Sequence, residues 1–522
     1  MLLYATKIAE DVMAGRRDLC GNPWVLPNLV SGEAEEGPLA VTTPRPRVFI
    51  WAPEKLLKEW RLKCPTCMRA TSPSELTSPR VVHTLTDYYL YVSTKHQCYS
   101  CAGTDRGLRP KITADQPQAL ACVPASLRRM RHIVSAGRIL FDIEVLDHVR
   151  SMATRTSWPA LADNINEMKY TSWARRFLGT KLTFLQLPGN LKVNQRVLRN
   201  LYMWDASERR EAVSQELEAE REATILMMDW TYDAAAKCSS PRLFNVMSCN
   251  QKCLVSKLTK SCSPKEVESE LVQLKHRGVM PRLVYVDDHC CGVWKHLLEK
   301  LWPYVHVRLD GMHAIRRLAR TTTSTQHPRH GAFCKALADA IYTYDSTELE
   351  RLQQAWKRAG HGSVLPAHIK KQYVPRRIID PTRTTAAIEG VLCDFGNSEE
   401  LAQALLTAAT NTAWGSLRRH VAAGCLCDPP GIDLNSYGAT MSVGGDDFQS
   451  VASMRGSSAL EGFHSHQKGW LGQRAIHSVE AGEALLRDGA VRWNRKRSSD
   501  SSPVYDPKLL RELGELNNVP QP

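Results

Sequence analysis

Three acidic residues stand where carboxylates could be gathered around divalent cations. Asp229 ends the apolar run ILMMD, Asp287 ends the apolar run LVYVD, and Glu461 lies in the segment SSALEGFH. Carboxylate oxygens suit Mg²⁺, and a pair of such ions can activate an attacking oxygen and stabilise a leaving one. One acid at a strand end is usually a solvated turn residue, but three in this order favour a metal site. We therefore predict that Asp229, Asp287 and Glu461 hold catalytic Mg²⁺ or Mn²⁺.

Neighbouring groups could assist this site. Asp288 follows Asp287, and the alternation of side chains along the strand makes Asp287 the preferred ligand. Asp310 ends another apolar run, VHVRLD, three residues before His313. We predict Asp310 among the metal-binding residues, although it could equally orient a neighbouring residue or cap a helix. His464 could face a phosphate or the attacking group, and packing in the core or at the surface explains it equally well.

Four cysteines have the spacing of zinc ligands. Cys64 and Cys67 form one Cys-x2-Cys pair, and Cys98 and Cys101 form another. Each such turn lets two thiolates reach one ion, and two turns complete a tetrahedral structural site that leaves no open position for a substrate. The paired spacing disfavours the alternative of unrelated buried thiols. We predict a zinc-ribbon-like module, with strands in the intervening segment Val81–Val92.

Other cysteines and histidines are less suited to hold a metal. His327, His330 and Cys334 form one group, and Cys425 and Cys427 form another. Neither group supplies four ligands at a recognised spacing. We expect structural roles, or none, for these side chains.

The acids require a sheet that brings distant strands together. Apolar runs predict strands over Ala223–Trp230, Leu243–Asn250, Cys253–Lys260, Arg282–Asp287 and Val305–Asp310. Helical periodicity predicts helices over Pro264–Gly278, Val293–Trp302 and Met312–Arg320. This order is that of an RNase H-like core, in which the acids lie on the first strand, at the end of the fourth strand and on a later helix.

The chain as a whole is predicted to be a multidomain protein with α+β and α/β parts. We expect a disordered arm over 1–47, the four-cysteine zinc-binding module over 48–105, a helical and possible DNA-binding region over 118–220, the first part of the RNase H-like mixed sheet core over 221–325, an all-α insertion with a hairpin over 326–450, the second part of the core over 451–494, and a basic then polar tail over 495–522.

The helical region is predicted from two stretches. Apolar residues recur at helical spacing from Leu127 to Val149, and Thr156–Phe177 is interpreted as short helices joined by a turn. A helix-turn-helix would fit this turn, but a plain helical bundle is favoured because the pattern is generic.

Charge and composition favour a nucleic-acid partner. Lys and Arg exceed Asp and Glu by 68 to 54 in the 522 residues, which gives a net charge of +14. Arg316, Arg317 and the basic cluster around Trp493 could neutralise phosphates, or the cluster could be a nuclear signal, though a solvated helix face explains them nearly as well. No apolar run is long enough for a membrane helix and no secretory segment is evident, so we expect a soluble, intracellular protein.

Several longer motifs add a family resemblance. The segments LVYVDDHCC, VRLDGMH, CDPPG, RGSSALEGFH and LLRDGAVRWN resemble those of DDE-type, RNase H-like transposase-like proteins of animal genomes. The pattern of Trp51 followed by the two cysteine pairs is similar to a zinc-binding domain of unknown function fused to such cores. Together the matches cover most of residues 48–497. Two departures, Trp230 after the first acid and Gly462 after the third, put activity in doubt.

The resemblance implies a nuclear transposase. It would cleave DNA strands and transfer them by two-metal-ion chemistry, with Asp229, Asp287 and Glu461 as catalytic acids and a helical insertion between the second and the third. It would act on DNA, on which it could assemble as a homo-oligomer. It would have no membrane partner. The alternatives are a domesticated, catalytically silent transposase-derived protein that binds DNA or chromatin, and a nuclease that cleaves without strand transfer.

Overall fold

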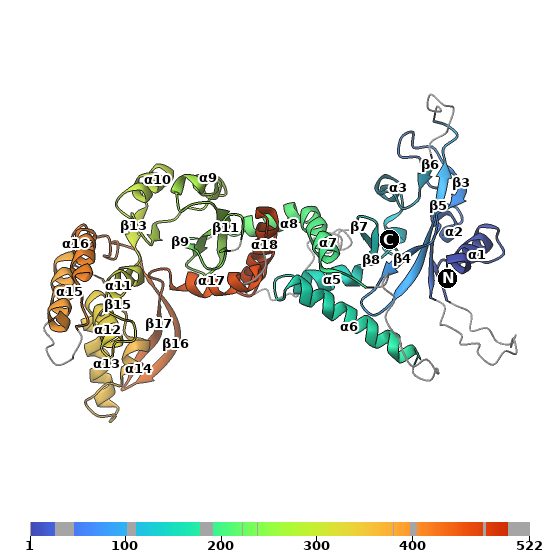
Figure 1. The fold of residues 1–522 in the computed structure, drawn as a ribbon. Helices are drawn as coiled ribbons and strands as arrows, with labels where there is room; N and C mark the ends of the chain where they lie inside the picture. Colours follow the sequence, from blue (N-terminus) through green and yellow to red (C-terminus); the bar gives the residue numbers. More distant parts are fainter. Residues whose placement is uncertain are drawn as a thin grey trace. The chain divides into compact units, whose positions relative to one another are not determined.

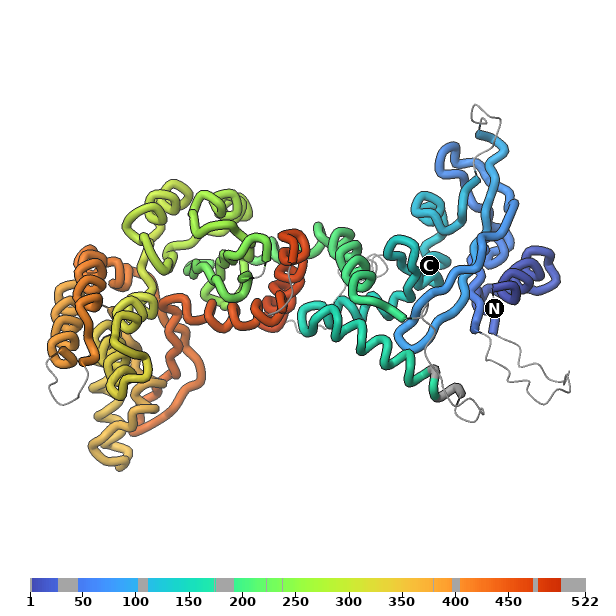
Figure 2. Tube along the Cα trace, in the orientation of Figure 1, coloured from blue at the N-terminus to red at the C-terminus, as the bar shows by residue number. Residues whose placement is uncertain are grey.

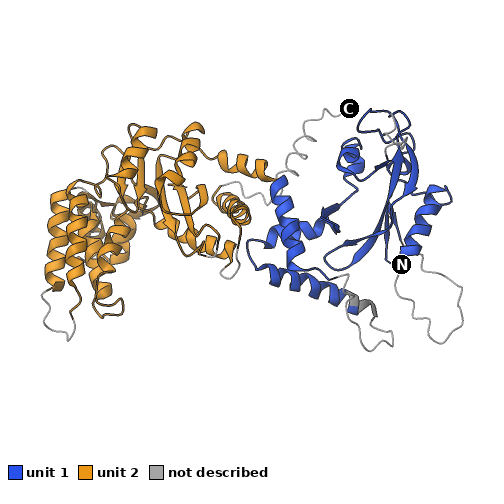
Figure 3. Cartoon of the chain, turned by 45° about the horizontal axis from the view of Figure 1, so that its top comes forward, with its two compact units in different colours: residues 1–208 blue, residues 209–522 orange. Residues whose placement is uncertain are grey.

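The computed structural model describes residues 2–26, 46–101, 111–177, 192–221, 223–236, 238–378, 380–396, 404–472 and 477–498. The chain forms two compact units, residues 1–208 and residues 209–522, which Figure 3 colours blue and orange. Both units combine α-helices with β-sheet, so the chain is a mixed α/β protein (Figure 1). None of the helices within these ranges is long and apolar enough to span a bilayer.

The sheet of the N-terminal unit is organised around one long strand, β5 (Tyr88–Gln97), which is almost wholly buried. It pairs in parallel with β2 (Val48–Trp51) and antiparallel with β4 (Arg80–His83). Its second half also pairs antiparallel with β3 (Ser72–Leu76) and β6 (Lys111–Thr113). The strands predicted within Val81–Val92 are therefore present, but they belong to a sheet much larger than a four-cysteine module.

The first residues form a helix where the sequence analysis predicts a disordered arm. α1 (Leu2–Met13) buries four apolar residues at helical spacing, Ala5, Ile8, Ala9 and Val12. β1 (Trp24–Val25) then pairs with β2 at the edge of the sheet. The prediction is wrong for these residues because it rested on the Pro, Gly and charged residues that follow them. Most of that later segment, residues 27–45, lies outside the described residues.

A hairpin interrupts the region predicted to be helical between Leu127 and Val149. β7 (Ile133–Ala136) and β8 (Ile139–Asp142) pair antiparallel, and β8 joins the sheet beside β4. Gly137 has φ of 63°, which suits the first position of a two-residue hairpin turn. The helical prediction is wrong here because the run IVSAGRILFD places β-branched residues on both sides of a turn glycine, a pattern typical of hairpins.

Helices complete the N-terminal unit. The short ones are α2 (Pro53–Leu56), α3 (Pro117–Ala121) and α4 (Ala125–Arg128), and the long ones are α5 (Ile143–Met152), α6 (Trp158–Phe177) and α7 (Gln195–Glu208). The turn predicted within Thr156–Phe177 is absent, because α6 is continuous and no Pro or Gly follows Pro159 within it. A buried ion pair between Arg150 and Asp205, 2.5 Å long, joins α5 to α7.

A five-stranded mixed sheet lies in the second unit. Its spatial order is β11 (Cys253–Thr259), β10 (Arg242–Ser248), β9 (Ile225–Thr231), β12 (Leu283–Val286) and β13 (His306–Leu309). The first three strands are antiparallel, whereas β12 runs parallel to both β9 and β13. Each strand agrees with its predicted position to within two residues at either end.

Helices cover both faces of this sheet. α9 (Glu268–His276), preceded by a 3₁₀ turn at Pro264–Glu266, and α10 (Val293–Leu301) pack on the face that carries Leu226, Met228 and Trp230. α17 (Ser458–Leu471) and α18 (Val479–Arg495) pack on the opposite face, against Met227 and Met247. α8 (Arg210–Glu218) lies beside α18. Figure 1 shows α17 and α18, drawn in red, close to the green strands.

The chain between β13 and α17 is mostly helical, as predicted. It contains α11 (Gly311–Ala319), α12 (His330–Ile341), α13 (Ser346–Arg358), α14 (Ala367–Tyr373), α15 (Pro381–Gly396) and α16 (Ala408–Ala422), with short strands β14 (Thr343–Tyr344) and β15 (Arg376–Arg377). α12, α15 and α16 share the main core with the sheet, whereas α13 and α14 pack with a hairpin in a smaller core. That hairpin, β16 (Asn435–Val443) and β17 (Asp446–Ser453), confirms the predicted one (Figure 2).

The packing of α18 against α17 gives a test of this core. A Cβ atom added at Gly489 would lie 2.2 Å from Cε3 of Trp470. We expect Gly489→Ala to lower the free energy of unfolding by about 1–3 kcal/mol through overpacking, measured by urea unfolding. Gly469→Ala is the matched control, because a Cβ there meets nothing within 4 Å. The control should be neutral or slightly stabilising through helix propensity, and equal effects of both substitutions would contradict the packing described here.

Candidate metal centres

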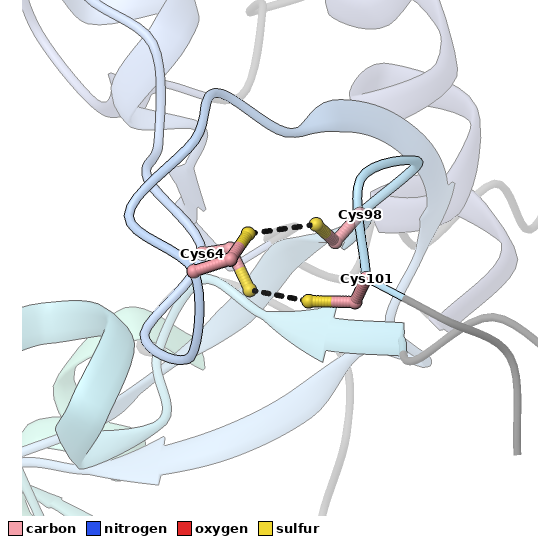
Figure 4. Close-up of side chains that lie close together, drawn as sticks. Cys64, Cys98 and Cys101 are labelled. Atoms are coloured by element: carbon pink, nitrogen blue, oxygen red, sulfur yellow. Dashed lines mark hydrogen bonds between the residues drawn. The ribbon is translucent and has the colours of Figure 1, made fainter.

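The four predicted zinc ligands lie together in the N-terminal unit. One atom from each of Cys64, Cys67, Cys98 and Cys101 lies within 4.8 Å of the others. The sulfur atoms of Cys64 and Cys101 are 3.6 Å apart (Figure 4). Those of Cys67 and Cys98 are 3.5 Å apart. Sulfur atoms bound to one tetrahedral zinc ion, with Zn–S near 2.3 Å, lie about 3.8 Å apart. This cluster could hold a zinc ion.

Local backbone structure prepares the first cysteine pair for a metal. The chain turns back after Cys67 through Met68, which has φ of 58° and donates its N–H to the carbonyl of Cys64 at 2.8 Å. Burial disfavours the thiolate of Cys64, but hydrogen bonds from the backbone N–H groups of Cys67 and Thr66, together with those from the thiols of Cys101 and Cys98, lower its pKa to about 6. A thiolate is the form that binds zinc, so the turn favours the ligating state.

The carboxylates of the second unit meet on the face of the sheet that α17 covers. Asp229 lies on β9 and shares this face with Met227. β12 pairs in parallel with β9 through Tyr285 and Met227, and the same register continued by two residues sets Asp287 beside Asp229. Glu461 extends from the first turn of α17, and its carboxylate lies within 4.8 Å of the ligand atoms of Asp229 and His313. Asp287 does not belong to the group of Asp229, His313 and Glu461, whose ligand atoms lie within 4.8 Å of one another.

His313 stands between two of the acids. Its Nδ1 is 3.1 Å from Oδ2 of Asp310, and its Nε2 is 4.0 Å from Oδ2 of Asp229. Burial alone would lower the pKa of His313, but the hydrogen bond to Asp310 and the negative charge of Asp229 raise it. These contacts therefore favour the protonated form of His313, whose Nε2 faces Asp229.

Asp310 is buried and hydrogen-bonded on both oxygens. Its side chain accepts from the N–H of Met312, which makes it the N-cap of α11, and from His313 and the N–H of Ser457. Burial would raise the pKa of Asp310, yet these donors lower it. Both alternatives weighed for Asp310, a helix cap and an orienting group, are present. Its direct binding of a metal stays a prediction.

Burial and neighbouring acids perturb Asp229 strongly. Its side chain is only 6% exposed. Burial, followed by the negative charge of Asp287, raises its pKa to about 7, while His313 opposes the rise. Burial also raises the pKa of Asp287. A bound cation would relieve this accumulation of acids, so the residues fit a divalent ion.

Arginines and a second histidine surround the acids. Arg316 pairs with Glu461, and Arg317 donates to Asp288 at 2.8 Å and to the backbone carbonyl of the preceding residue. The side chain of Asp288 thus points to Arg317. Burial would raise the pKa of Asp288, but hydrogen bonding and the positive charge of Arg317 lower it. Burial lowers the pKa of His464 to about 4, and its Nδ1 is 4.0 Å from a carboxylate oxygen of Asp229.

The two departures from the expected motif do not obstruct the carboxylates. Trp230 points to the opposite face of the sheet from Asp229, where it packs on Phe244 and Trp294. A Cβ added at Gly462 would meet no atom within 4 Å. Neither residue therefore crowds the acids.

Sequence reasoning missed the place of His313 and one cysteine group. The sequence prediction gives His313 no role of its own beside Asp310. The signal that could have found it is the Asp-x2-His spacing at a helix start, which brings both side chains to the same side of the helix. Cys425 lies with Cys290, Cys291 and His420, within 4.8 Å of one another, and not in a cluster with Cys427. Their separation along the chain leaves no spacing signal.

Comparison with known protein families gives a match in the first unit. A domain of unknown function, DUF6729, matches residues 3–195. The match includes the four clustered cysteines and coincides with most of the N-terminal unit. No curated protein matches the chain.

Loss of one cysteine tests the N-terminal centre. We expect Cys98→Ser to release about one zinc ion per chain, because three ligands hold the ion poorly, and to lower the melting temperature of the N-terminal unit. Metal analysis after dialysis and thermal unfolding would measure both effects. Cys20→Ser is the control, since Cys20 is exposed and outside the cluster. Unchanged zinc content in Cys98→Ser would contradict the assignment.

The raised pKa of Asp229 gives a pH test. With a pKa of about 7 when folded and 3.8 as the ordinary value, folding binds protons between these values, so stability is lost as the pH rises through 7. Asp229→Asn removes that loss. Without added divalent cations, we expect the variant to melt above wild type at pH 8, with a difference that shrinks towards pH 5. Asp233→Asn, whose side chain is 85% exposed, should show no such trend. A pH-independent difference would contradict the shift.

Proposed function

We propose that the second unit is an RNase H-like, DDE-type core that cleaves DNA strands and transfers them, as a transposase does. The observation that carries the proposal is the meeting of Asp229 and Glu461 around His313, with Asp287 beside Asp229 in the strand register. These residues come from segments far apart in the sequence. Such convergence of acids on one sheet face is typical of a metal-dependent phosphoryl-transfer site.

The strand order supports this proposal. Three antiparallel strands are followed by two parallel ones, and the first strand lies in the middle of the sheet. Asp229 lies on that first strand, Asp287 directly follows the fourth, and Glu461 lies on a helix after a long insertion. This is the arrangement that an RNase H-like core of the DDE type requires.

The proposed chemistry needs divalent cations. Asp229, Asp287 and Glu461 would hold Mg²⁺ or Mn²⁺, and the bound cations would supply activation of the attacking oxygen and stabilisation of the leaving oxygen of a phosphodiester. Asp310 fixes the ring of His313 through Nδ1, so that Nε2 faces Asp229. Burial disfavours protonation of His464, and its Nε2 has no hydrogen-bond partner among the described residues, so this atom is left to contact the substrate.

The proposed partner is DNA in the nucleus. The net charge of +14 supports binding to a polyanion, since phosphate neutralisation dominates the affinity of such complexes. Some of the basic residues predicted to meet phosphates have partners within the protein: Arg316 and Arg317 pair with acids, and Arg495, at the end of α18, pairs with Glu216. A zinc ion in the N-terminal unit would be structural, and assembly as a homo-oligomer on DNA is part of the proposal.

A second candidate function is a domesticated protein that binds DNA or chromatin without catalysis. The ion pair between Arg316 and Glu461 favours it, because this pair occupies a carboxylate that the catalytic proposal needs for metal. Cation binding would have to compete with Arg316. DNA affinity without metal-dependent cleavage would distinguish this protein from an active enzyme.

The test is nicking and strand transfer on DNA that carries the terminal sequences flanking the gene. We expect activity with Mg²⁺ or Mn²⁺ in wild type, and loss to background in Asp229→Asn and Glu461→Gln, which remove a metal-binding charge while keeping shape. Gel analysis of nicked and joined products measures both steps. Cleavage without joining would indicate a plain nuclease.

The matched control is Asp233→Asn, which removes an exposed acid four residues after Asp229 and should keep full activity. DNA binding is measured in parallel for every variant. A wild-type protein that folds and binds DNA but shows neither nicking nor strand transfer would reject the catalytic proposal and favour the domesticated binding protein.

A further inference from the structure

A second group of metal-type ligands lies in the second unit, apart from the carboxylates. Cys290, Cys291, His420 and Cys425 each place one ligand atom within 4.8 Å of the others. Nδ1 of His420 is 3.2 Å from Sγ of Cys290 and 3.1 Å from Sγ of Cys291. Cys290 and Cys425 are buried. Three thiols and one imidazole therefore converge from two segments that are well separated in the sequence.

The backbone of each segment is shaped to present its ligands. His289, directly before the adjacent cysteines, has φ of 50°, a left-handed conformation that costs energy for a residue with a side chain. This residue redirects the chain after β12, so that Cys290 and Cys291 both reach His420. Left-handed backbone of this kind is found where the surrounding structure, or a ligand, enforces it.

The other two ligands come from the end of α16. Gly424 has φ of 72° and donates its N–H to the carbonyl of Val421, while Cys425 donates to the carbonyl of His420 at 3.0 Å. These two bonds form a Schellman motif, in which the chain folds back over the last helical turn. The motif brings Cys425 next to His420, although five positions separate them in the sequence.

The donor set fits zinc. Three thiolates and one imidazole form a recognised structural zinc site, in which all four positions are occupied by protein ligands. A zinc-bound sulfur and a zinc-bound nitrogen lie about 3.5 Å apart, given Zn–S near 2.3 Å and Zn–N near 2.0 Å. The observed distances to Nδ1 are close to this value. A disulfide would use only two of the three thiols and would not explain the imidazole.

We propose that Cys290, Cys291, His420 and Cys425 form a second structural zinc site, which fastens the loop after β12 to the C-terminal end of α16. The loop begins with Asp287 and Asp288. Cys425 also accepts a hydrogen bond from the N–H of Leu309 at 2.8 Å, so the site adjoins the end of β13 as well. Zinc binding here does not depend on the proposed nuclease function.

The experiment counts zinc in the full chain, expressed with zinc, purified under reducing conditions and dialysed. We expect about two zinc ions per chain in wild type and about one in Cys290→Ser/Cys425→Ser. Cys64→Ser/Cys98→Ser should also retain about one, which separates the two centres. Hydrogen exchange should rise in residues 287–292 and 419–427 of the first double variant, because the fastening is lost.

Three further variants keep the test decisive if the double variant folds poorly. His420→Cys should retain the second ion as a four-thiolate site, whereas His420→Ala should lose it on dialysis. Cys427→Ser should keep both ions, since Cys427 lies near Cys425 in sequence but outside the group. A wild-type chain with a single zinc ion that depends only on Cys64 and Cys98 would overturn the proposal. A disulfide between Cys290 and Cys425 in the protein purified under reducing conditions would also overturn it.

Discussion

The geometry of the second unit depends on one buried carboxylate, that of Asp310. It has no exposed surface, and it accepts hydrogen bonds from Met312, His313 and Ser457. A buried charge is tolerated only when donors compensate it, so these contacts cannot be given up singly without a large cost. The same side chain therefore caps α11, orients an imidazole and fixes the start of α17. Gly456 permits this approach, because a Cβ there would lie 2.7 Å from Oδ1 of Asp310.

The clustered groups use two kinds of chemistry for two purposes. Thiol clusters lie where separate segments must be held together, and soft sulfur ligands suit a closed tetrahedral ion. The carboxylates instead lie on a sheet face, with Glu461 43% exposed and Asp229 nearly buried. Hard oxygen ligands at a partly open position would leave room for the phosphate of the proposed substrate, which a closed site would not. The kind of ligand, rather than the degree of burial, thus separates the thiol clusters from the carboxylate group.

Local patterns were enough to predict the strands of the second unit, since runs such as ILMMD and LVYVD carry the β-branched and apolar residues of buried strands. The Cys-x2-Cys pairs likewise predicted their own cluster. The failures had physical causes. The hairpin at Gly137 was mistaken for helix because its apolar residues also recur at helical steps. Neither the pairing of Arg316 with Glu461 nor the meeting of Cys290 with His420 has a local signal, because tertiary packing alone brings these residues together.

The distance along the chain between Asp310 and Ser457, 147 residues, affects how the protein is made. Contacts of such long range form slowly, because the intervening chain must first be ordered. During synthesis the five strands emerge well before α17 and α18, so the apolar face that carries Met227 and Met247 stays uncovered while the insertion is translated. A nascent chain in this state is prone to aggregate. Production of the protein should therefore depend on chaperones that shield this face until the last helices leave the ribosome.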